Sequence, residues 1–431
     1  MIKAFTSLQL HWQILIALVL AVLAGWLSGE DAGLFGVSFY QVYDFFGSLF
    51  LNALKMLIVP LIVSSIIVGM MGIGSGENLG RLGGKTLIYY ATTSLIAIVI
   101  GLVLVNLIAP GIVDGQPIKE IIGLADVPDA VTENVAGKGA GDIVDVFLRM
   151  VPPNIVLAAA NGQMLGLIFF SLLFGFFVTK LNQPQAGVMQ NVWQAILDVM
   201  MMMTNWVMLF APIGVFALVA KVVAVSGVEI FKPLAFFFFT VIVALAVHFA
   251  GSMYLILRFV AKVNPLRHYK VMSSALLTAF STSSSSATLP LTMECVEQKA
   301  GVSNRVTSFT LPMGATVNMD GTALYECVAA MFIAQAYGLD LTLTTQFTIV
   351  LVALVTSIGV AGIPSASLVA ISIILGTIGL PLEGVGLILA VDRVLDMCRT
   401  AVNVFSDSVA AVVIARLEGE QGILQKDPQD Y

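Results

Sequence analysis

A row of charged residues lies inside an otherwise apolar segment near the C-terminal end of the chain. The segment, residues 391–409, reads VDRVLDMCRTAVNVFSDSV. On a helix at about 100° per residue, five polar side chains fall on one arc roughly 80° wide: Asp392, Asp396, Arg399, Asn403 and Asp407. One charge at the centre of a bilayer costs about 2.5–3.5 kcal/mol by insertion scales. Several in a row therefore indicate a functional site, and the other side of the helix would lie against lipid or packed protein.

The composition indicates an integral membrane protein. Of 431 residues, 58% are hydrophobic and only 11% are charged, and the mean hydropathy is +0.98. Soluble domains carry about 25% charged residues. The apolar runs at 14–27, 87–108 and 234–260 are long enough for helices that cross a bilayer. The net charge of −6, scattered along the chain, argues against nucleic acid as a partner.

Cysteine and histidine give no sign of metal or nucleophilic chemistry. Three cysteines lack metal-ligand spacing and are typical of small buried hydrophobic residues, and three histidines lie far apart: Cys295, Cys327 and Cys398, and His11, His248 and His268. A nucleophile among Ser283–Ser286 would need a base within hydrogen-bond reach, and His248 is the one candidate in the apolar segments. We therefore predict that the protein is not an enzyme and holds no cofactor.

The first half of the chain reads as a series of membrane helices. We expect an uncleaved helix at 14–27, a second at 43–71, an inside loop at 72–85 that carries Arg81 and Lys85, and a third helix at 86–108. The polar residues 110–145 look extracytoplasmic. A broken apolar region at 151–180 precedes two long helices, 188–223 and 233–260, and a basic loop at 258–270 that the span count puts in the cytoplasm.

Two later apolar segments of membrane length are interrupted by small and polar residues. Residues 271–290 contain STSSSS at 281–286 and close at Pro290, and residues 347–380 contain SIGVAGIPSAS at 357–367. Non-helical backbone at membrane depth occurs only where it is buried in protein or lines a cavity. Paired interrupted segments point to a transport site between inverted repeats. We predict two repeats, 271–338 and 341–416, each an interrupted hairpin followed by a helix.

Between the two interrupted segments lies GATVNMDGTALYE, residues 314–326. Asn318, Asp320 and two glycines in the middle of a span predict a helix broken into two halves. Hard cations prefer oxygen ligands. Carbonyl groups freed by the break, together with the Asp320 carboxylate, therefore predict a site for Na⁺.

Four motifs in this order resemble those of the dicarboxylate/amino acid:cation symporters, the family of glutamate and aspartate transporters. They are STSSSSATLP (281–290), NMDGTALYE (318–326), AGIP (361–364) and DMCRTAVNVFSD (396–407), and the resemblance begins at KMLIVPLIVSS (55–65). It implies an all-α membrane protein with eight transmembrane helices and two re-entrant helical hairpins. It also implies a homotrimer in which a transport unit moves like an elevator against a scaffold.

The resemblance also divides the chain into parts. Scaffold helices one and two would occupy 1–75, helix three of the transport unit 76–112, an extracytoplasmic loop 113–145, scaffold and trimerisation helices four and five 146–225, the rest of the transport unit 226–417, and a cytoplasmic tail 418–431. That remainder comprises helix six, hairpin one, helix seven, hairpin two and helix eight. Both termini would be cytoplasmic, in the inner (plasma) membrane of the cell.

The resemblance implies sodium-coupled uptake of an acidic amino acid, aspartate or glutamate, and leaves open whether protons are coupled as well. Arg399 matches the residue that binds the side-chain carboxylate of the substrate, as suits a planar guanidinium fork. Asp396 matches the residue that takes the α-amino group. Further substrate contacts are implied at Thr322, Thr400, Asn403, Ser284, Ser285 and Ile363.

Three sodium sites are implied in the same way. The first would use Gly314, Asn318, Asn403 and Asp407; the second Tyr90, Thr93, Ser94, Asn318 and Asp320; and the third the carbonyl groups of Thr316, Ser357, Ile358 and Val360. Glu326 matches a position tied to proton coupling in mammalian members of the family. A hydrogen-bonded helix residue is an equally good interpretation of Glu326.

The chain departs from the family pattern at several positions. Archaeal members carry an extra arginine at the position of Ser283, and mammalian members carry it at the position of Met397. This chain has an arginine at neither position. Arg393 lies one turn before Asp396, so our hypothesis is that Arg393 pairs with Asp396 or Asp392. Val360, Ser406 and the hairpin sequence PSAS at 364–367 also differ from the archaeal or glycine-rich pattern.

Alternative functions remain open at this stage. A passive ion channel would also place charges on a helix stripe, but paired broken hairpins and a carboxylate-binding arginine suit occlusion of a solute. Within the transporters, Asp396 argues against a C4-dicarboxylate carrier and Arg399 against a neutral amino acid carrier. The sequence does not separate aspartate from glutamate, fix the ion stoichiometry, or show whether H⁺ or K⁺ is also coupled.

Overall fold

The computed structural model describes residues 10–72, 77–122, 148, 151–161, 164–227, 231–359, 366–380 and 384–425, which are almost wholly helical. The prediction of an all-α protein needs one small correction. Two short antiparallel strand pairs form tight hairpins at loop positions: β1 (Gly33–Leu34) with β2 (Val37–Ser38), and β3 (Ile112–Val113) with β4 (Gln116–Pro117), the latter followed by α5 (Ile118–Ile122).

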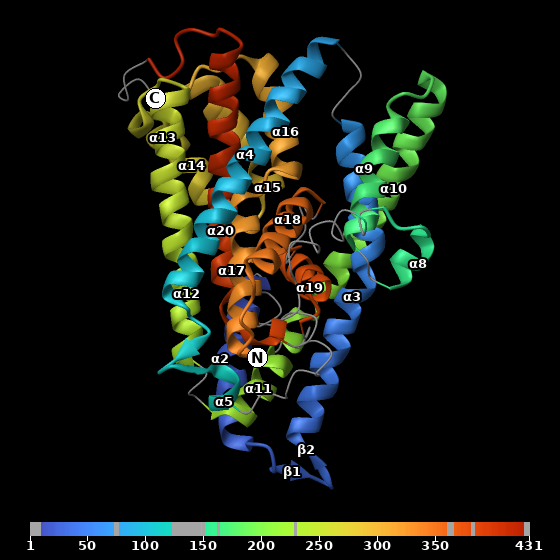
Figure 1. Cartoon of the computed structure of the whole chain (residues 1–431), viewed down its shortest axis with the longest axis vertical. Coiled ribbons are helices and arrows are strands. Elements are labelled where there is room, and N and C mark those ends of the chain that lie inside the picture. Colours follow the sequence, from blue (N-terminus) through green and yellow to red (C-terminus); the bar gives the residue numbers. More distant parts are fainter. Residues whose placement is uncertain are drawn as a thin grey trace.

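The helices pack in two groups that lie side by side (Figure 1). In the first group, α3 contacts α9, α10 and α11, and α11 also contacts α2. The members of this group, with the short α8 beside α9, are α2 (Leu10–Ser28), α3 (Phe39–Gly72), α8 (Ile155–Ala160), α9 (Met164–Val178), α10 (Gln183–Met208) and α11 (Ala211–Ser226).

The second group is centred on two helices, α17 (Asp320–Ala336) and α20 (Val385–Leu417), which contact each other. Around them lie α4 (Glu77–Ile108), α12 (Phe231–Val247) with its continuation to residue 260, α14 (Pro265–Thr282), α15 (Ser285–Glu294), α16 (Asn304–Val317), α18 (Leu343–Gly359) and α19 (Ala366–Ile378). Most of the apolar stretch of α20, 83%, is buried inside the protein, compared with 33% for α4 and 39% for the α12 span. The charged helix is therefore the central one.

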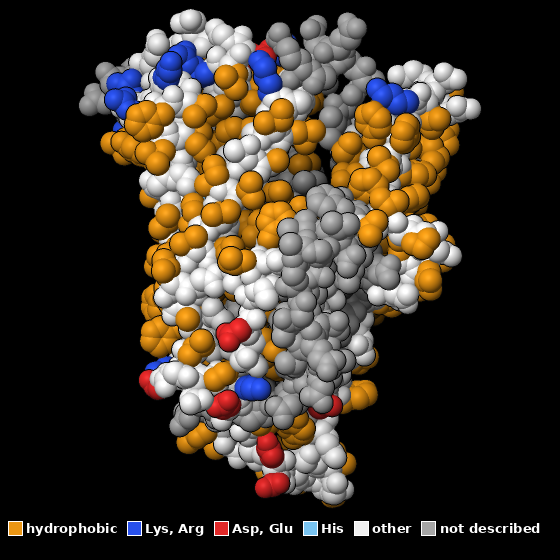
Figure 2. Space-filling view, viewed as in Figure 1, with side chains coloured by type: hydrophobic (Ala, Val, Ile, Leu, Met, Phe, Trp, Pro, Cys, Tyr) orange, Lys and Arg blue, Asp and Glu red, His pale blue; other side chains and the backbone are white. Residues whose placement is uncertain are grey.

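Several helices are long and apolar enough to cross a membrane. Within the described ranges these are Leu82–Ile108, Phe231–Val260 and Val385–Leu417, and the pair α10 and α11 makes a fourth span if its two parts are counted together. Figure 2 shows apolar side chains along the middle of one face, with Lys and Arg mostly at one end and Asp and Glu mostly at the other. This distribution fits a membrane protein.

Three sequence predictions about helix boundaries were wrong. The predicted helix at 188–223 is broken between α10 and α11 and bends by 54°: a new helix begins at Ala211, with Pro212 in its first turn. The predicted loop at 72–85 is mostly the first turns of α4. Pro290 does not close the first hairpin, because it lies inside α15, which continues through a π-helical turn, η4 (Cys295–Lys299).

The predicted interruptions are present. α14 and α15 separate at Ser283, which has a left-handed backbone (φ 50°), and Ser284 then caps α15 by accepting a hydrogen bond from the Ala287 N–H. α18 and α19 are separate helices, and the tip between them, residues 360–365, lies outside the described residues. Asn318, which has an extended backbone, and Met319, which is not helical, separate α16 from α17, as the NMDG sequence predicts.

The segment after α20 packs against the region that joins the first hairpin to α16. The Leu424 N–H donates to the Ala300 carbonyl at 2.9 Å, and the Glu420 carboxylate accepts from both the N–H, at 3.0 Å, and the hydroxyl of Ser303. Ile423 and Leu424 are buried. The predicted tail is 418–431, and its described part, 418–425, therefore connects the end of α20 to the start of α16.

Replacement of Glu420 tests this connection. Glu420→Ala leaves the two Ser303 donors without their acceptor, so we expect the free energy of unfolding to fall by about 1–3 kcal/mol. The measurement is the thermal unfolding midpoint of the detergent-solubilised protein. Glu30→Ala, at an exposed glutamate, is the matched control and is expected to leave the midpoint in place. Equal midpoints for the two variants would contradict the account.

Candidate functional site

The charged row of α20 forms a buried ionic cluster. Arg399 is completely buried, and its Nη2 donates to Asp396 Oδ1 at 2.9 Å and to Asp392 Oδ1 at 3.2 Å. Arg393 Nη1 donates to the other oxygen of Asp396, Oδ2, at 3.2 Å. The hypothesised pairing of Arg393 with Asp396 is thus present in the structure. Asp392, for which the motifs imply no firm role, accepts from Arg399 instead.

The guanidinium of Arg399 retains capacity for a further anion. Its Nε and Nη1 have no hydrogen-bond partner among the residues that the structure describes. Its Cζ lies 3.9 Å from the ring centroid of Tyr325 in α17, so the ring covers one face of the guanidinium. Unsatisfied buried donors are costly, and a planar fork of this kind binds a carboxylate by two parallel hydrogen bonds. The cluster is therefore suited to a ligand with a carboxylate group.

Asn403 joins this cluster to the beginning of α17. Its Oδ1 accepts from the Gly321 N–H at 2.8 Å, and its Nδ2 donates to Thr322 Oγ1 at 3.0 Å. One turn earlier, Thr400 Oγ1 donates to the Asp396 carbonyl at 2.8 Å. The first N–H groups of α17, which have no partner within the helix, are thus held by a side chain of α20.

A second buried centre surrounds Asp320, the first residue of α17. Its Oδ1 accepts from Ser94 Oγ at 2.6 Å and from Thr93 Oγ1 at 3.3 Å, both in α4. Its Oδ2 accepts from Ser406 Oγ at 2.6 Å, and His248 Nε2 lies 3.2 Å from the same oxygen. The carboxylate is fully buried, with polar groups from three helical segments around it.

Asp407 lies in the same polar region. Asn318 Nδ2 donates to Asp407 Oδ1 at 2.8 Å and to Ser406 Oγ at 3.0 Å, so Asn318 and Ser406 connect the two carboxylates. A Cβ on Gly314 would lie 2.6 Å from the Asp407 Cγ and 2.7 Å from the hydroxyl of Tyr90, so glycine lets these groups approach. Asn318 Oδ1 is buried and has no partner within the described residues.

The structure brings together most of the first two predicted sodium sets. Gly314, Asn318 and Asp407 meet, as do Thr93, Ser94 and Asp320, and Ser406 joins the two sets. Two members make other contacts: Asn403 bonds to the start of α17, and the Tyr90 hydroxyl donates to the Thr310 carbonyl at 2.8 Å.

The third predicted set consists of carbonyl groups, one of which, that of Val360, lies outside the described residues, so this set stays a prediction. The hydroxyl groups of Thr316 and Ser357 each bond to their own helix, at the carbonyls of Met313 and Leu354. The side chain of Ile358, and Val360 and Ile363 as a whole, lie outside what the structure describes.

The predicted hairpin serines and Glu326 have separate surroundings. Ser284 and Ser285 lie at the start of α15, and in the described part of the chain no hydrogen bond joins them to Arg399. Glu326 is fully buried in α17, where its Oε2 accepts from Thr356 Oγ1 of α18 at 3.1 Å. Its Oε1 has no partner among the described residues.

Sequence reasoning missed three residues of these centres: Tyr325, Ser406 and His248. Tyr325 and Ser406 lie inside the motifs that were singled out. His248 follows Val241 and Leu245 on the buried stripe of α12. That helical spacing was the available signal, but it shows only that a residue is buried and not which carboxylate it meets.

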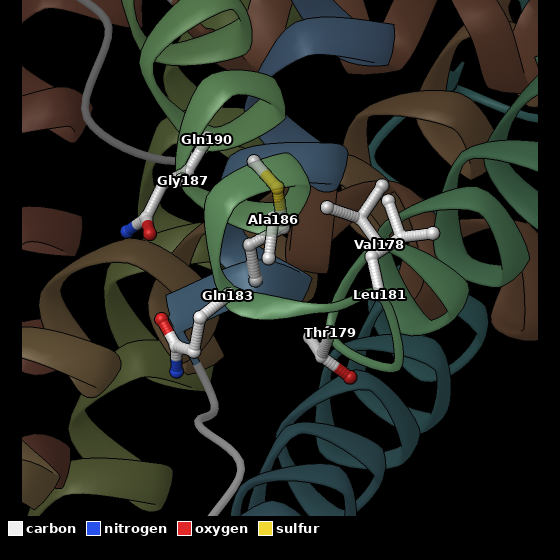
Figure 3. A pocket seen from close by; sticks show the side chains of 8 residues that line it. Val178, Thr179, Leu181, Gln183, Ala186, Gly187 and Gln190 are labelled. Atoms are coloured by element: carbon white, nitrogen blue, oxygen red, sulfur yellow. The ribbon is translucent and has the colours of Figure 1, made fainter.

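A cavity elsewhere in the protein does not compete with this site. It has a volume of about 120 Å³ and lies at the turn between α9 and α10, where Thr179, Gln183 and Gln190 supply its polar side chains (Figure 3). None of the described residues that line it is charged. The buried charges of α17 and α20 are therefore the stronger candidate.

Comparison with known proteins gives similarity over nearly the whole chain. A family model described as "Sodium:dicarboxylate symporter family" matches residues 10–417. The chain is 38% identical to the Proton/sodium-glutamate symport protein of Geobacillus stearothermophilus over 418 residues, 96% of each chain. It is 38% identical to the Proton/glutamate-aspartate symporter of Escherichia coli (strain K12) over 95% of this chain and 93% of that protein. It is 35% identical to Excitatory amino acid transporter 3 of Homo sapiens, over 96% of this chain and 87% of that protein.

The close contact of α17 with α20 gives a direct test of the site geometry. A Cβ on Gly321 would lie 2.8 Å from the Arg399 carbonyl oxygen, so Gly321→Ala forces the two helices apart. We expect a loss of about 1–3 kcal/mol in unfolding free energy, as for other overpacked sites. Gly386→Ala, in α20 with no atom within 4 Å of the added Cβ, is the control for thermal unfolding. Equal stability of both variants would show that the contact is looser than described.

Proposed function

The chain belongs to the sodium:dicarboxylate symporter family, and we propose that it is a secondary active transporter that couples uptake of aspartate or glutamate to sodium. The observation that carries the proposal is the buried Arg399, with two guanidinium nitrogens that have no partner among the described residues. The names of its bacterial relatives, which include glutamate and aspartate symporters, support an acidic amino acid as the substrate.

In this proposal the substrate bridges the charged residues of α20. Arg399 binds the side-chain carboxylate through its free nitrogens, and Asp396 receives the α-ammonium group. Both Asp396 oxygens already face arginine donors, so the ammonium group competes with Arg393 and Arg399 for them. The remaining contacts would come from Thr322, Thr400 and Asn403, and from the hairpin tips at Ser284, Ser285 and Ile363.

Sodium is proposed to bind at the two buried carboxylates. Asp407 with Gly314, Asn318 and Asn403 would form one site, and Asp320 with Tyr90, Thr93, Ser94 and Asn318 a second. Their hydroxyl, amide and carboxylate oxygens are the ligands that a hard cation prefers. A third site, from carbonyl groups of Thr316, Ser357, Ile358 and Val360, rests on the resemblance alone.

The coupling of ion and substrate is proposed to run through the start of α17. Asp320 is the first residue of that helix, and the next two, Gly321 and Thr322, are bonded to Asn403. A cation that fixes Asp320 therefore also fixes the residues beside Asn403 and Arg399. Each ligand then raises the affinity of the site for the other.

The larger architecture is proposed from the family and the packing. We propose eight transmembrane helices with two re-entrant hairpins, and an elevator movement of the second helix group against the first, which would be the scaffold. Both termini would be cytoplasmic in the plasma membrane. The trimer is proposed from the family resemblance, and its interface would use an exposed apolar stripe on α10 that lipid would cover in a single copy: Val188, Val192, Ile196, Val199 and Met203.

Uptake into liposomes tests the function. We expect labelled aspartate to enter when sodium is high outside, with competition by glutamate and less by succinate or serine. Arg399→Lys keeps the charge and loses the planar fork. It is expected to cut uptake about tenfold or more, since a hydrogen bond to a charged group contributes about 1.5–3 kcal/mol. Arg258→Lys, at an exposed arginine, is the control. Uptake that needs no sodium, or equal competition by serine, would contradict the proposal.

The same assay with pH and potassium gradients varied separately examines Glu326. We propose that Glu326 carries a co-transported proton, because it is buried and one of its oxygens has no partner in the described structure. Glu326→Gln keeps an acceptor for Thr356 and removes the proton site. Uptake by the variant is therefore expected to lose its dependence on the proton gradient. A gradient dependence equal to that of the original protein would exclude Glu326 from this role.

A further inference from the structure

The two oxygens of Asp320 are held by different parts of the chain. Oδ1 accepts from Ser94 and Thr93 of α4, whereas Oδ2 contacts Ser406 of α20 and His248 at the end of α12. The motif-derived sodium set contains the Oδ1 donors and neither of the Oδ2 contacts. The orientation of this carboxylate thus depends on two residues outside that set.

His248 is placed by a π-helical turn. The turn, η2 (His248–Ser252), leads to α13 (Met253–Leu255), and the Met253 N–H bonds to the His248 carbonyl five residues back. From Leu245 onward, the buried residues along this helix are Leu245, His248, Met253 and Leu257. The spacing from His248 to Met253 is five residues, whereas the other spacings are three and four. The extra residue shifts the buried stripe of the helix by one position. Such single π-turns are frequent at functional sites.

Tyr269, in the first arm of the first hairpin, fastens this turn. Its hydroxyl donates to the carbonyl of Phe249, the residue after His248. Its ring stacks on Phe405 with centroids 4.5 Å apart and meets the Phe249 ring edge-on at 5.0 Å. Phe405 immediately precedes Ser406. The neighbours of both Oδ2 contacts therefore pack against one tyrosine.

We propose that Tyr269 is a positioning residue that couples the first hairpin to the Asp320 cation centre, by holding His248 and Ser406 at the Oδ2 oxygen. The inference rests on the proposed function because it takes Asp320 to be a sodium ligand. Groups that orient a metal ligand typically change metal affinity 10–100-fold when replaced. Movement of the first hairpin, whose Ser284 and Ser285 contact the substrate in the proposed function, would thereby also alter the sodium centre.

The test measures sodium binding without any amino acid. The thermal midpoint of the full-length protein in detergent is followed against sodium concentration, with choline keeping the ionic strength constant, because a ligand stabilises the folded state that binds it. His248→Asn is expected to raise the half-effective sodium concentration about tenfold, and Tyr269→Phe, which keeps the ring and removes the hydroxyl, roughly threefold. Tyr254→Phe, at an exposed tyrosine of α13, is the matched control and is expected to behave like the original protein.

A second readout separates positioning from general damage. Aspartate affinity at saturating sodium is expected to stay within about twofold in Tyr269→Phe, because saturating sodium restores the Asp320 centre. An unchanged sodium half-point in Tyr269→Phe, while the original protein responds to sodium, would overturn this inference alone. No sodium response in the original protein would overturn the proposed function together with it.

Discussion

Charge in an apolar interior must be surrounded by polar partners, and the second helix group of this protein is built to supply them. Arg399, Asp320 and Glu326 are fully buried, and Asp392 and Asp407 nearly so. Removing a carboxylate from water costs several kcal/mol unless donors replace the water. The broken helix at Asn318 and Met319, the polar residues of α4 and the π-turn of α12 each bring donors to these groups. The irregular backbone is therefore required by the buried charge and is not incidental to it.

The arrangement puts two kinds of site on one pair of helices. Arg399 lies against Tyr325 of α17, and Asp320 is the first residue of the same helix. Asn403 lies one turn after Arg399 on α20 and accepts from the Gly321 N–H, next to Asp320. A membrane protein that must bind an anionic solute and a cation together gains from this proximity, because each ligand offsets charge that the other would otherwise leave unpaired.

The sequence was sufficient for the membrane class, the family, the two interrupted hairpins and the break at Asn318. These features depend on local rules: apolar run length, small polar residues in mid-span, and glycine next to Asp320. Pairings between distant helices were not predictable from spacing. The contacts of His248 and Ser406 with Asp320, and of Asp392 with Arg399, depend on how helices rotate against each other. The bend at Pro212 and the continuation of α15 past Pro290 show that proline alone does not decide where a helix ends, since context selects between a new start and an interior position.

The account depends on reciprocal coupling between the Arg399 centre and the Asp320 and Asp407 centre. Titration calorimetry of the purified protein measures it by recording aspartate affinity across a range of sodium concentrations, and sodium affinity across a range of aspartate concentrations. The account predicts that each ligand tightens the other by the same factor, as thermodynamic linkage requires. Aspartate affinity that does not change with sodium would contradict it.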